Sequence, residues 1–198
     1  MAIYYNGLKI ESNEEVYEPA EDTFLLAESL LDEVKSDDIV LDVGTGTGIL
    51  ALLAARRARF VVGLDINEKA INLAWKNAKI NGIKNVVFIL SDLFENIRGT
   101  FDLIVFNPPY LPGEEIKDKV DLALIGGKTG GEVISRFLGS VKDYLSSRGR
   151  ILLIYSSLTG LDVEKAFKER GFSTSIVKRR RFFFEELYVM KAELSSRL

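Results

Sequence analysis

The most constraining feature of this sequence is a short apolar segment that runs directly into a glycine-rich turn and then a helical pattern. Ile39–Val43 has the composition of a buried strand, Gly44–Gly48 reads Gly-Thr-Gly-Thr-Gly, and Gly48–Ala58 is rich in Ala and Leu. A strand, a tight turn and a helix in immediate succession make up most of a βαβ unit, which belongs to a parallel sheet covered by helices. The sequence therefore predicts an α/β fold.

The same alternation continues along the chain. Apolar segments with strand character lie at Phe60–Asp65, Val86–Leu90, Phe101–Phe106 and Arg150–Tyr155, and helical patterns lie at about 67–81, 129–145 and 161–170. Two last strands, near Ser173–Lys178 and Glu186–Lys191, are too close together for a helical crossover, so they should form an antiparallel hairpin at one edge. We expect a Rossmann-like, mostly parallel seven-stranded sheet with that C-terminal hairpin.

The N-terminal region predicts a small hairpin followed by a helix. Asn6-Gly7 separates two short apolar runs, Ile3–Tyr5 and Leu8–Ile10, and this pair suits the positive φ angles of a type I′ turn. Pro19 suits a position just inside the start of the helix that follows. We expect residues 1–198 to form a single domain, in which residues 1–36 are an appendage to the core.

Composition excludes several kinds of chemistry. The 198 residues contain no Cys and no His, so disulfides, thiolate nucleophiles, cysteine zinc sites and imidazole bases are ruled out. A formal net charge of -3 argues against a protein that binds duplex DNA through bulk electrostatics. The chain has neither an apolar run of about 18–20 residues nor a secretory signal pattern, so we expect a cytoplasmic protein without a membrane segment.

Acidic residues stand at the ends of three consecutive predicted strands. Asp42 precedes the glycine turn, Asp65 ends the second strand, and Asp92 follows the third. Open α/β sheets bind ligands at the carboxyl ends of their strands, where these side chains should meet. The Gly-x-Gly-x-Gly spacing differs from that of dinucleotide folds and resembles the loop of S-adenosylmethionine-dependent methyltransferases. Asp65 would then accept hydrogen bonds from a ribose, and Asp92 from an adenine amino group.

The most specific motif is Asn107-Pro108-Pro109-Tyr110, directly after the fourth strand. Consecutive prolines fix the backbone and remove N–H donors, which leaves the Asn107 side-chain oxygen and the Pro108 carbonyl as hydrogen-bond acceptors. Two acceptors suit a planar NH₂ group, which is a poor nucleophile because its lone pair is delocalised. Such a site can hold the nitrogen against a methyl group and stabilise the positive charge that develops there. Tyr110 could stack on the planar target.

With these motifs the chain resembles the HemK-type N5-glutamine methyltransferases of class-I translation release factors, and most closely their small single-domain archaeal and eukaryotic branch. The marks that carry the resemblance are Val16–Thr23, the Gly44–Gly48 loop, Asn107–Tyr110, and Leu122–Gly127 with Gly130. The resemblance implies a class I methyltransferase fold. It also implies that S-adenosyl-L-methionine is the cofactor and that the substrate is the glutamine of a Gly-Gly-Gln loop.

The resemblance also assigns roles to individual residues. Catalysis would fall to Asn107, Pro108, Pro109 and Tyr110. The cofactor would be bound by Glu18, Pro19, Asp22, Thr23, Asp42, Gly44, Thr45, Gly46, Gly48, Asp65, Ile66, Asp92, Leu93 and Asn107. No metal site is expected.

Two further features concern partners. Val86–Leu90 should lie at a sheet edge, and it has no Lys or Pro that would block pairing, so a small zinc-ribbon activator of the kind the family uses could add a strand there. A helix or loop that covers this edge is the alternative. The basic-aromatic segment Lys178–Phe184 could contact RNA or an acidic face of the release factor, but a solvated strand connection is the simpler interpretation.

Other functions remain open at the level of sequence. N-methylation of an exocyclic amine in nucleic acid, such as adenine N6 or cytosine N4, uses a similar motif, and another protein could be the substrate. A non-catalytic cofactor-binding subunit would not need the acceptors of Asn107–Tyr110. The glycine spacing and the absence of His argue against a nicotinamide oxidoreductase.

Overall fold

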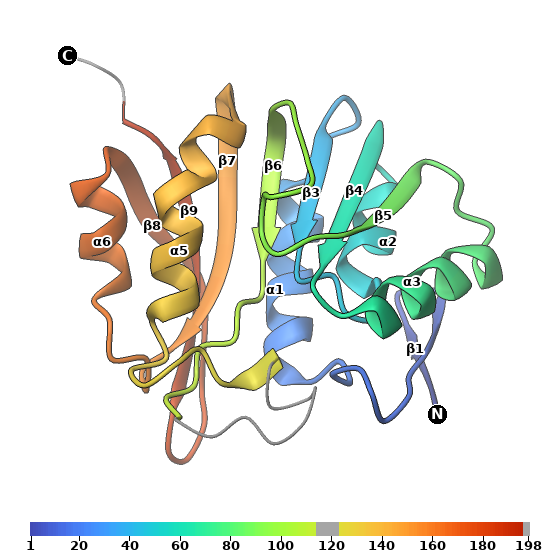
Figure 1. The fold of residues 1–198 in the computed structure, drawn as a ribbon, viewed down its shortest axis with the longest axis horizontal. Helices are drawn as coiled ribbons and strands as arrows, with labels where there is room; N and C mark the ends of the chain where they lie inside the picture. The colour runs from blue at the N-terminus through green and yellow to red at the C-terminus, as the bar shows by residue number, and fades with distance from the viewer. Residues whose placement is uncertain (114–122, 196–198) are drawn as a thin grey trace.

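A single seven-stranded sheet organises the protein (Figure 1). The computed structural model describes residues 1–113 and 123–195, so Leu122 and the other residues between these ranges lie outside the description. The strand order is β5-β4-β3-β6-β7-β9-β8. The strands are β3 (Ile39–Val43), β4 (Phe60–Asp65), β5 (Val86–Leu90), β6 (Phe101–Phe106), β7 (Leu145–Ser156), β8 (Phe172–Arg181) and β9 (Glu186–Leu194). Strands β3 to β7 are parallel, and β9 pairs antiparallel with both β7 and β8, which confirms the predicted fold class.

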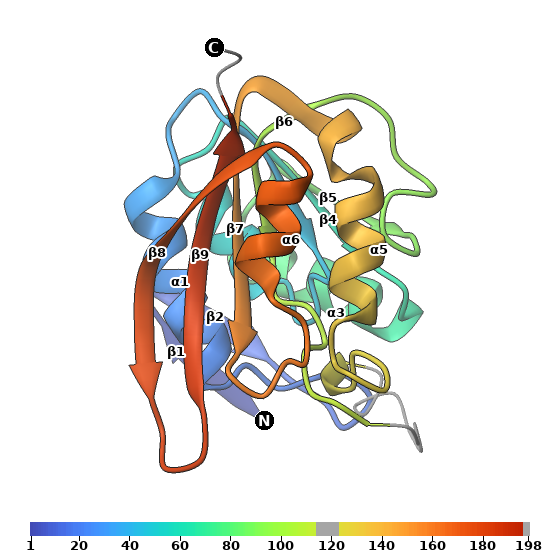
Figure 2. The same cartoon turned by 90° about the vertical axis from the view of Figure 1, so that its left-hand side faces the viewer.

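Helices cover both faces of the sheet. They are α1 (Glu21–Glu33), α2 (Ile49–Ala55), α3 (Glu68–Ile80), α5 (Glu132–Ser140) and α6 (Val163–Glu169), with a 3₁₀ turn η1 (Val141–Tyr144) after α5. Helices α1 and α2 contact each other on one side of the sheet, and α5 and α6 lie together on the other side (Figure 2). Among the described residues, no helix combines the length and the apolar character that a membrane span requires.

The predicted N-terminal hairpin forms and is tied to α3. Strands β1 (Ala2–Tyr5) and β2 (Leu8–Glu11) pair antiparallel, and Asn6 and Gly7 both have positive φ angles, 46° and 75°. The Asn77 side chain of α3 accepts from the Glu11 N–H at 2.9 Å and donates to the Glu11 carbonyl at 3.0 Å. Asn81 repeats both contacts with Lys9 at 2.9 and 2.8 Å. The two asparagines thus act as a partner strand for the free edge of β2.

Helix α1 begins two residues later than predicted. Pro19 lies before the helix, Ala20 is its N-cap, and the first helical residue is Glu21. The helix is part of the main core, since Leu26 and Leu30 are fully buried and α1 contacts β7, β8 and β9.

The helix predicted at 129–145 is shorter than expected. At its predicted start, the Glu132 carboxylate accepts from the Thr129 N–H at 2.9 Å and from the Thr129 hydroxyl at 3.0 Å. The helix nevertheless begins at Glu132, whose own N–H donates to the Gly126 carbonyl at 3.1 Å instead of to a threonine cap. After Ser140 the chain tightens into η1, and β7 begins at Leu145.

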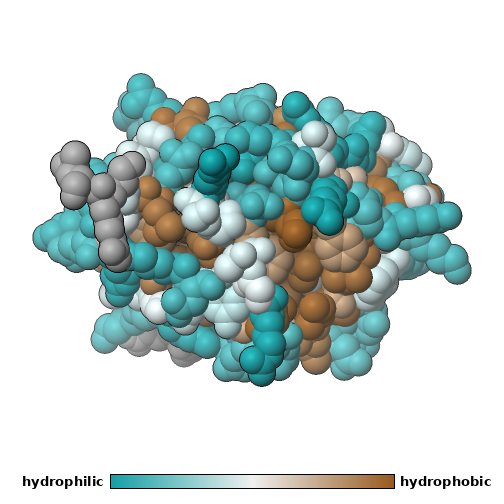
Figure 3. Space-filling model, turned by 90° about the horizontal axis from the view of Figure 1, so that it is seen from above, coloured by the Kyte–Doolittle hydropathy of each residue, from teal (hydrophilic) through white to brown (hydrophobic). Residues whose placement is uncertain are grey.

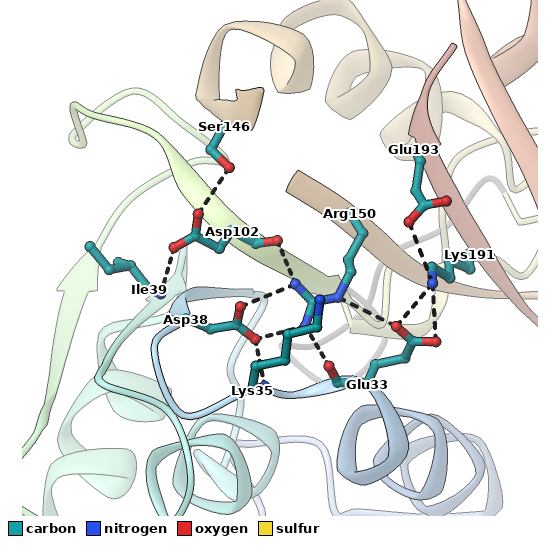
Figure 4. Close-up of polar contacts among 9 residues, drawn as sticks. All are labelled: Glu33, Lys35, Asp38, Ile39, Asp102, Ser146, Arg150, Lys191 and Glu193. Carbon is teal, nitrogen blue, oxygen red and sulfur yellow. Dashed lines mark hydrogen bonds and ion pairs between the residues drawn. The ribbon is translucent and has the colours of Figure 1, made fainter. Parts of the chain in front are cut away.

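A buried ion cluster fastens the amino-terminal end of the parallel strands (Figure 4). Arg150 of β7 is only 3% exposed, and its guanidinium lies 2.7 Å from an Asp38 oxygen and 3.4 Å from a Glu33 oxygen. Lys191 of β9 pairs with Glu33 at 3.1 Å. The cluster joins the end of α1 to β7 and β9. Figure 3, which looks onto this end of the molecule, shows a mainly hydrophilic surface with apolar side chains visible between the polar ones.

Candidate active site

A cavity opens where the parallel strands end. It is concave and lined by apolar side chains with a few polar groups, as ligand-binding cavities usually are. Segments after β3, β4, β5 and β6 line it, together with residues before α1 and two residues of α5. Figure 1 shows these carboxyl ends at the same end of the sheet. Of the predicted site residues, the lining includes Pro19, Thr23, Gly44, Thr45, Gly46, Asp65, Ile66, Asp92, Leu93, Asn107 and Pro109.

The glycine turn after β3 is shaped for close approach to a ligand. Gly44 and Gly46 have φ angles of 66° and 54°, in the left-handed region that favours glycine. A Cβ added at Gly46 would meet nothing within 4 Å, so that residue faces open space. Gly48 serves a different purpose, because an added Cβ would lie 3.0 Å from the Ala74 Cβ of α3. Gly48 therefore lets two helices pack and does not line the cavity.

Asp42 lies beneath this turn and not in the cavity. It is 1% exposed, and its Oδ2 accepts from the Thr45 hydroxyl at 2.7 Å and from the Ala51 N–H at 3.1 Å. Its Oδ1 is buried and has no hydrogen-bond partner among the described residues. Burial raises the pKa of Asp42 to about 7. Asp42 thus ties the turn to the first residues of α2 and keeps one unused acceptor.

Asp65 lines the cavity at the end of β4. Its Oδ2 accepts from the Gly46 N–H at 2.8 Å, and its Oδ1 accepts from the Asn67 N–H at 2.9 Å. Burial raises the pKa of Asp65 above its ordinary value. Each carboxylate oxygen can accept a second hydrogen bond, so Asp65 can still receive two hydroxyl groups from a ribose.

The segment after β5 brings Asp92 and Leu93 to the cavity. Asp92 Oδ2 lies 2.8 Å from a guanidinium nitrogen of Arg136 on α5. Arg136 also lines the cavity, and sequence reasoning missed it because an exposed arginine on a helix has no distinguishing signal. Leu93 has a φ angle of 47°, which is uncommon for a residue other than glycine. The Ser91 hydroxyl holds this conformation by donating to the Leu93 carbonyl at 2.9 Å.

Asn107 is held in one orientation by residues that precede α1. Its side-chain Nδ2 donates to Asp22 Oδ2 at 3.0 Å and contacts the Thr23 hydroxyl at 3.4 Å. Because the NH₂ end of the amide has an anionic acceptor, the Oδ1 end is the one left to accept from a ligand. No residue in the described ranges donates to that oxygen.

Asp22 is the hub of this network. It is 4% exposed, and besides Asn107 it accepts from the Thr23 N–H at 2.6 Å, from the Tyr17 hydroxyl at 3.1 Å and from the Tyr110 hydroxyl at 3.3 Å. Burial, reinforced by the Asp22 charge, raises the pKa of both Tyr17 and Tyr110 above the ordinary value. Both tyrosines are therefore neutral donors at physiological pH. Tyr110 is 8% exposed and does not line the cavity.

Three other predicted residues, Asp22, Pro108 and Glu18, lie outside the cavity lining. Pro108 is buried, and Glu18 is an exposed residue that accepts from the Ser12 hydroxyl at 3.4 Å.

Two glycines fit closely against the backbone of Asn107–Tyr110. A Cβ added at Gly126 would lie 2.3 Å from the Pro109 carbonyl oxygen, and one added at Gly130 would lie 2.3 Å from the Tyr110 carbonyl oxygen. Both distances are too short for any side chain, so these positions need glycine in this fold. The requirement explains why glycines at 126 and 130 accompany the motif at 107–110.

The hydrogen-bond acceptors in the cavity suit S-adenosylmethionine. A nucleoside needs acceptors for its ribose and adenine groups, and Asp65 and Asp92 follow adjacent strands on one side of the cavity. The open space at Gly46 leaves room for a ligand against the backbone. The residues present therefore fit this cofactor.

Comparisons with known proteins agree with the geometry. The family model "Methyltransferase small domain" matches residues 18–183. A protein of Methanocaldococcus jannaschii, provisionally named as a protein N5-glutamine methyltransferase, is 44% identical over 97% of this chain and 98% of its own length. A release factor glutamine methyltransferase of Lactococcus lactis is 34% identical over 84% of this chain and 65% of its own. Among solved structures, the E. cuniculi Mtq2–Trm112 complex, described as responsible for methylation of the eRF1 translation termination factor, aligns with a TM-score of 0.74 at 31% identity, covering 91% of this chain and 99% of that one.

Proposed function

The chain belongs to the protein N5-glutamine methyltransferases within the methyltransferase small domain family, and from this premise we propose that its substrate is a class-I translation release factor. The reaction moves a methyl group from S-adenosylmethionine to the side-chain amide nitrogen of the glutamine in the Gly-Gly-Gln loop. The HemK-type resemblance stated from the motifs is confirmed by the relatives.

The observation that carries the proposal is the hydrogen bond from Asn107 to Asp22. It points the Asn107 amide so that its oxygen is available to a substrate NH₂ group. A glutamine amide is planar and offers two N–H donors, which match Asn107 Oδ1 and the carbonyl of Pro108. The motif assigns the second acceptor to the carbonyl of Pro108, because the prolines provide no backbone N–H that would occupy it.

These residues would act by positioning and electrostatics. S-adenosylmethionine supplies an electrophilic methyl group when it is bound. Two acceptors on the glutamine nitrogen would localise its lone pair toward that group and stabilise the positive charge that grows during transfer. Tyr17 and Tyr110 keep their protons, so they hold Asp22 in place and do not serve as bases. The surplus proton leaves from a nitrogen that has become acidic, for which water is a sufficient acceptor.

The cofactor would occupy the side of the cavity formed by β3, β4 and β5. We assign the ribose to Asp65 and the methionine portion to the turn at Gly44–Gly46. The adenine would lie against Leu93 with its amino group toward Asp92. Since Asp92 is already paired with Arg136, that amino group would share the carboxylate with the guanidinium. Pro19 and Thr23 would close the cavity from the α1 side.

We also propose a small zinc-ribbon activator at the β5 edge of the sheet. Strand β5 is the terminal strand of the sheet, as the predicted topology requires. Apolar side chains surround its end, with Leu90 47%, Trp75 44% and Ile66 53% exposed. Strand addition would cover them and would place the activator beside the cofactor cavity, to which Ile66 belongs. Leu90→Lys should then weaken activation by the zinc-ribbon protein without changing cofactor affinity.

The test is transfer of labelled methyl from S-adenosylmethionine to a purified release factor. One control is the same factor with Ala in place of the Gly-Gly-Gln glutamine, and the other is the Asn107→Ala enzyme, which should bind cofactor but not transfer. The proposal is supported if wild-type enzyme labels the wild-type factor, while the factor with Ala in place of the glutamine and the Asn107→Ala enzyme both give no label. Cofactor binding without label on the factor, with or without the activator, overturns it and points to a nucleic-acid amine or another protein.

A further inference from the structure

The β8–β9 hairpin ends in an exposed pair of aromatic side chains. Strands β8 and β9 remain paired as far as Arg181 and Glu186, and residues 182–185 form the turn. Phe183 is 92% exposed and Phe184 is 84% exposed, and their rings meet edge to face with centroids 4.6 Å apart. Figure 2 shows that the turn projects beyond the rest of the molecule at the end where β7 finishes. This is the end at which the cavity opens.

The basic residues of β8 divide into two sets, and the first set forms ion pairs with α1. Lys178 pairs with Glu28 at 3.2 Å and Asp32 at 3.4 Å, and Arg180 pairs with Glu21 and Glu28 at 2.6 and 3.0 Å. These contacts attach the hairpin to α1.

Arg179 and Arg181 alternate with this first set along the strand, so they point to the opposite face. Both are exposed, and neither forms an ion pair with any residue in 1–113 or 123–195. The hairpin therefore combines an anchored face with an outer face that carries two unpaired cations.

The turn is fixed next to the segment Asn107–Tyr110. The Ser156 hydroxyl donates to Glu185 Oε2 at 2.7 Å, and the Ser157 N–H donates to the Glu186 carbonyl at 2.8 Å. Two residues further on, the Thr159 hydroxyl donates to the Tyr110 carbonyl at 3.0 Å. A partner that places an amide at Asn107 would therefore have the hairpin beside it.

We propose that Arg179, Arg181, Phe183 and Phe184, here called the arm, are a docking surface for the protein substrate. The inference rests on the proposed function, because it takes the substrate to be a folded protein that extends beyond the cavity. The complementary surface would carry carboxylates for the two arginines and an apolar recess for the two rings. At protein interfaces, charged pairs usually lie at the rim, and buried aromatic side chains contribute much of the binding energy.

An RNA partner fits the arm less well. The two rings meet at an interplanar angle of 78°, so they do not form a flat platform on which successive bases could stack. Seating two tilted rings in an apolar recess of a protein needs no such platform, so the ring geometry favours a protein partner.

The experiment compares two substrates, the intact release factor and a short peptide that carries only its Gly-Gly-Gln segment. The enzymes are wild type, Phe183→Ser with Phe184→Ser, and Arg179→Glu with Arg181→Glu. The matched control is Arg57→Glu with Arg59→Glu, an exposed pair with the same spacing at the amino end of β4. Thermal unfolding of each variant checks that the fold is intact, which the high exposure of the four residues leads us to expect.

Both arm variants should raise KM for the intact factor by about tenfold or more, with kcat and the peptide kinetics unchanged and the control pair equal to wild type. An unchanged KM for the intact factor overturns the proposal, as does an equal loss with factor and peptide. Loss of binding to a ribosomal RNA fragment with an unchanged KM for the factor would assign the arm to RNA instead. If wild-type enzyme transfers no label to the factor, the proposed function itself has failed, which separates the two outcomes.

Discussion

Replacing Asp22 by Asn tests the orientation of Asn107 directly. The substitution keeps the size of the side chain but turns one carboxylate oxygen into an NH₂ group. That group cannot accept from Asn107, whose Nδ2 lies 3.0 Å from Asp22 Oδ2. A hydrogen bond to a charged acceptor contributes about 1.5–3 kcal/mol. If this contribution is what keeps Asn107 Oδ1 directed at the substrate, kcat should fall roughly 10- to 150-fold.

The assay separates positioning from general damage. Single-turnover methyl transfer reports the chemical step, and titration reports the affinity for S-adenosylmethionine, which should stay within about twofold because Asp22 does not line the cavity. The matched control is Glu21→Gln, which removes a neighbouring charge that pairs with Arg180 at the surface and should change kcat less than twofold. A folded Asp22→Asn enzyme with wild-type kcat would refute the reasoning.

Three other substitutions test the site and the fold. Asp65→Ala should weaken cofactor binding about 10- to 100-fold by titration, because two hydroxyl acceptors are lost, and an unchanged Kd would rule out the ribose assignment. Because the pKa of Asp42 is raised to about 7, the folded state retains a proton that the unfolded state releases near pH 4, so the free energy of unfolding should fall by up to about 4 kcal/mol as pH rises from about 4 to 7. Denaturant titrations should show this slope in wild type and not in Asp42→Asn, whereas equal slopes would contradict it. Arg150→Ala leaves Asp38 buried without its cation and should lower the free energy of unfolding by about 3–5 kcal/mol, against less than about 0.5 kcal/mol for the exposed Arg148→Ala. Similar losses in these two variants would refute a stabilising role for the cluster.

Local sequence determined the elements and their order. Strands β3, β4, β5 and β6 lie where apolar segments predicted them, because a run of five or six apolar residues between turns has few other stable arrangements. Strands β7, β8 and β9 contain their predicted segments but are longer. The positive φ angles at Asn6 and Gly7 followed from their residue types. The helical pattern predicted from about residue 67 corresponds to α3, whose N-cap Asn67 accepts from the Lys69 N–H through its side chain. The motif at 107–110 indicated the reaction because its prolines limit what the backbone can offer a ligand.

Helix ends were less predictable, because tertiary contacts compete with local signals there. The Gly126 carbonyl takes the N–H of Glu132, which moves the start of α5 away from Thr129. The last residues of the predicted helix form η1 instead, and β7 begins early at Leu145, whose side chain is buried. Propensity within a window of residues carries no information about such distant partners.

What only the tertiary structure decided is which side chains share a contact. Asp22 and Asn107 are 85 residues apart, and Asp92 and Arg136 are 44 apart, so no spacing rule connects them. The position of Asp42 before the glycines predicted that it would bind the ligand. In the fold its side chain lies under the loop, and Asp65 is the carboxylate that lines the cavity. The physical reason is that sequence pattern fixes the strand end at which a residue stands, but the packing of helices against the sheet fixes the direction in which its side chain points.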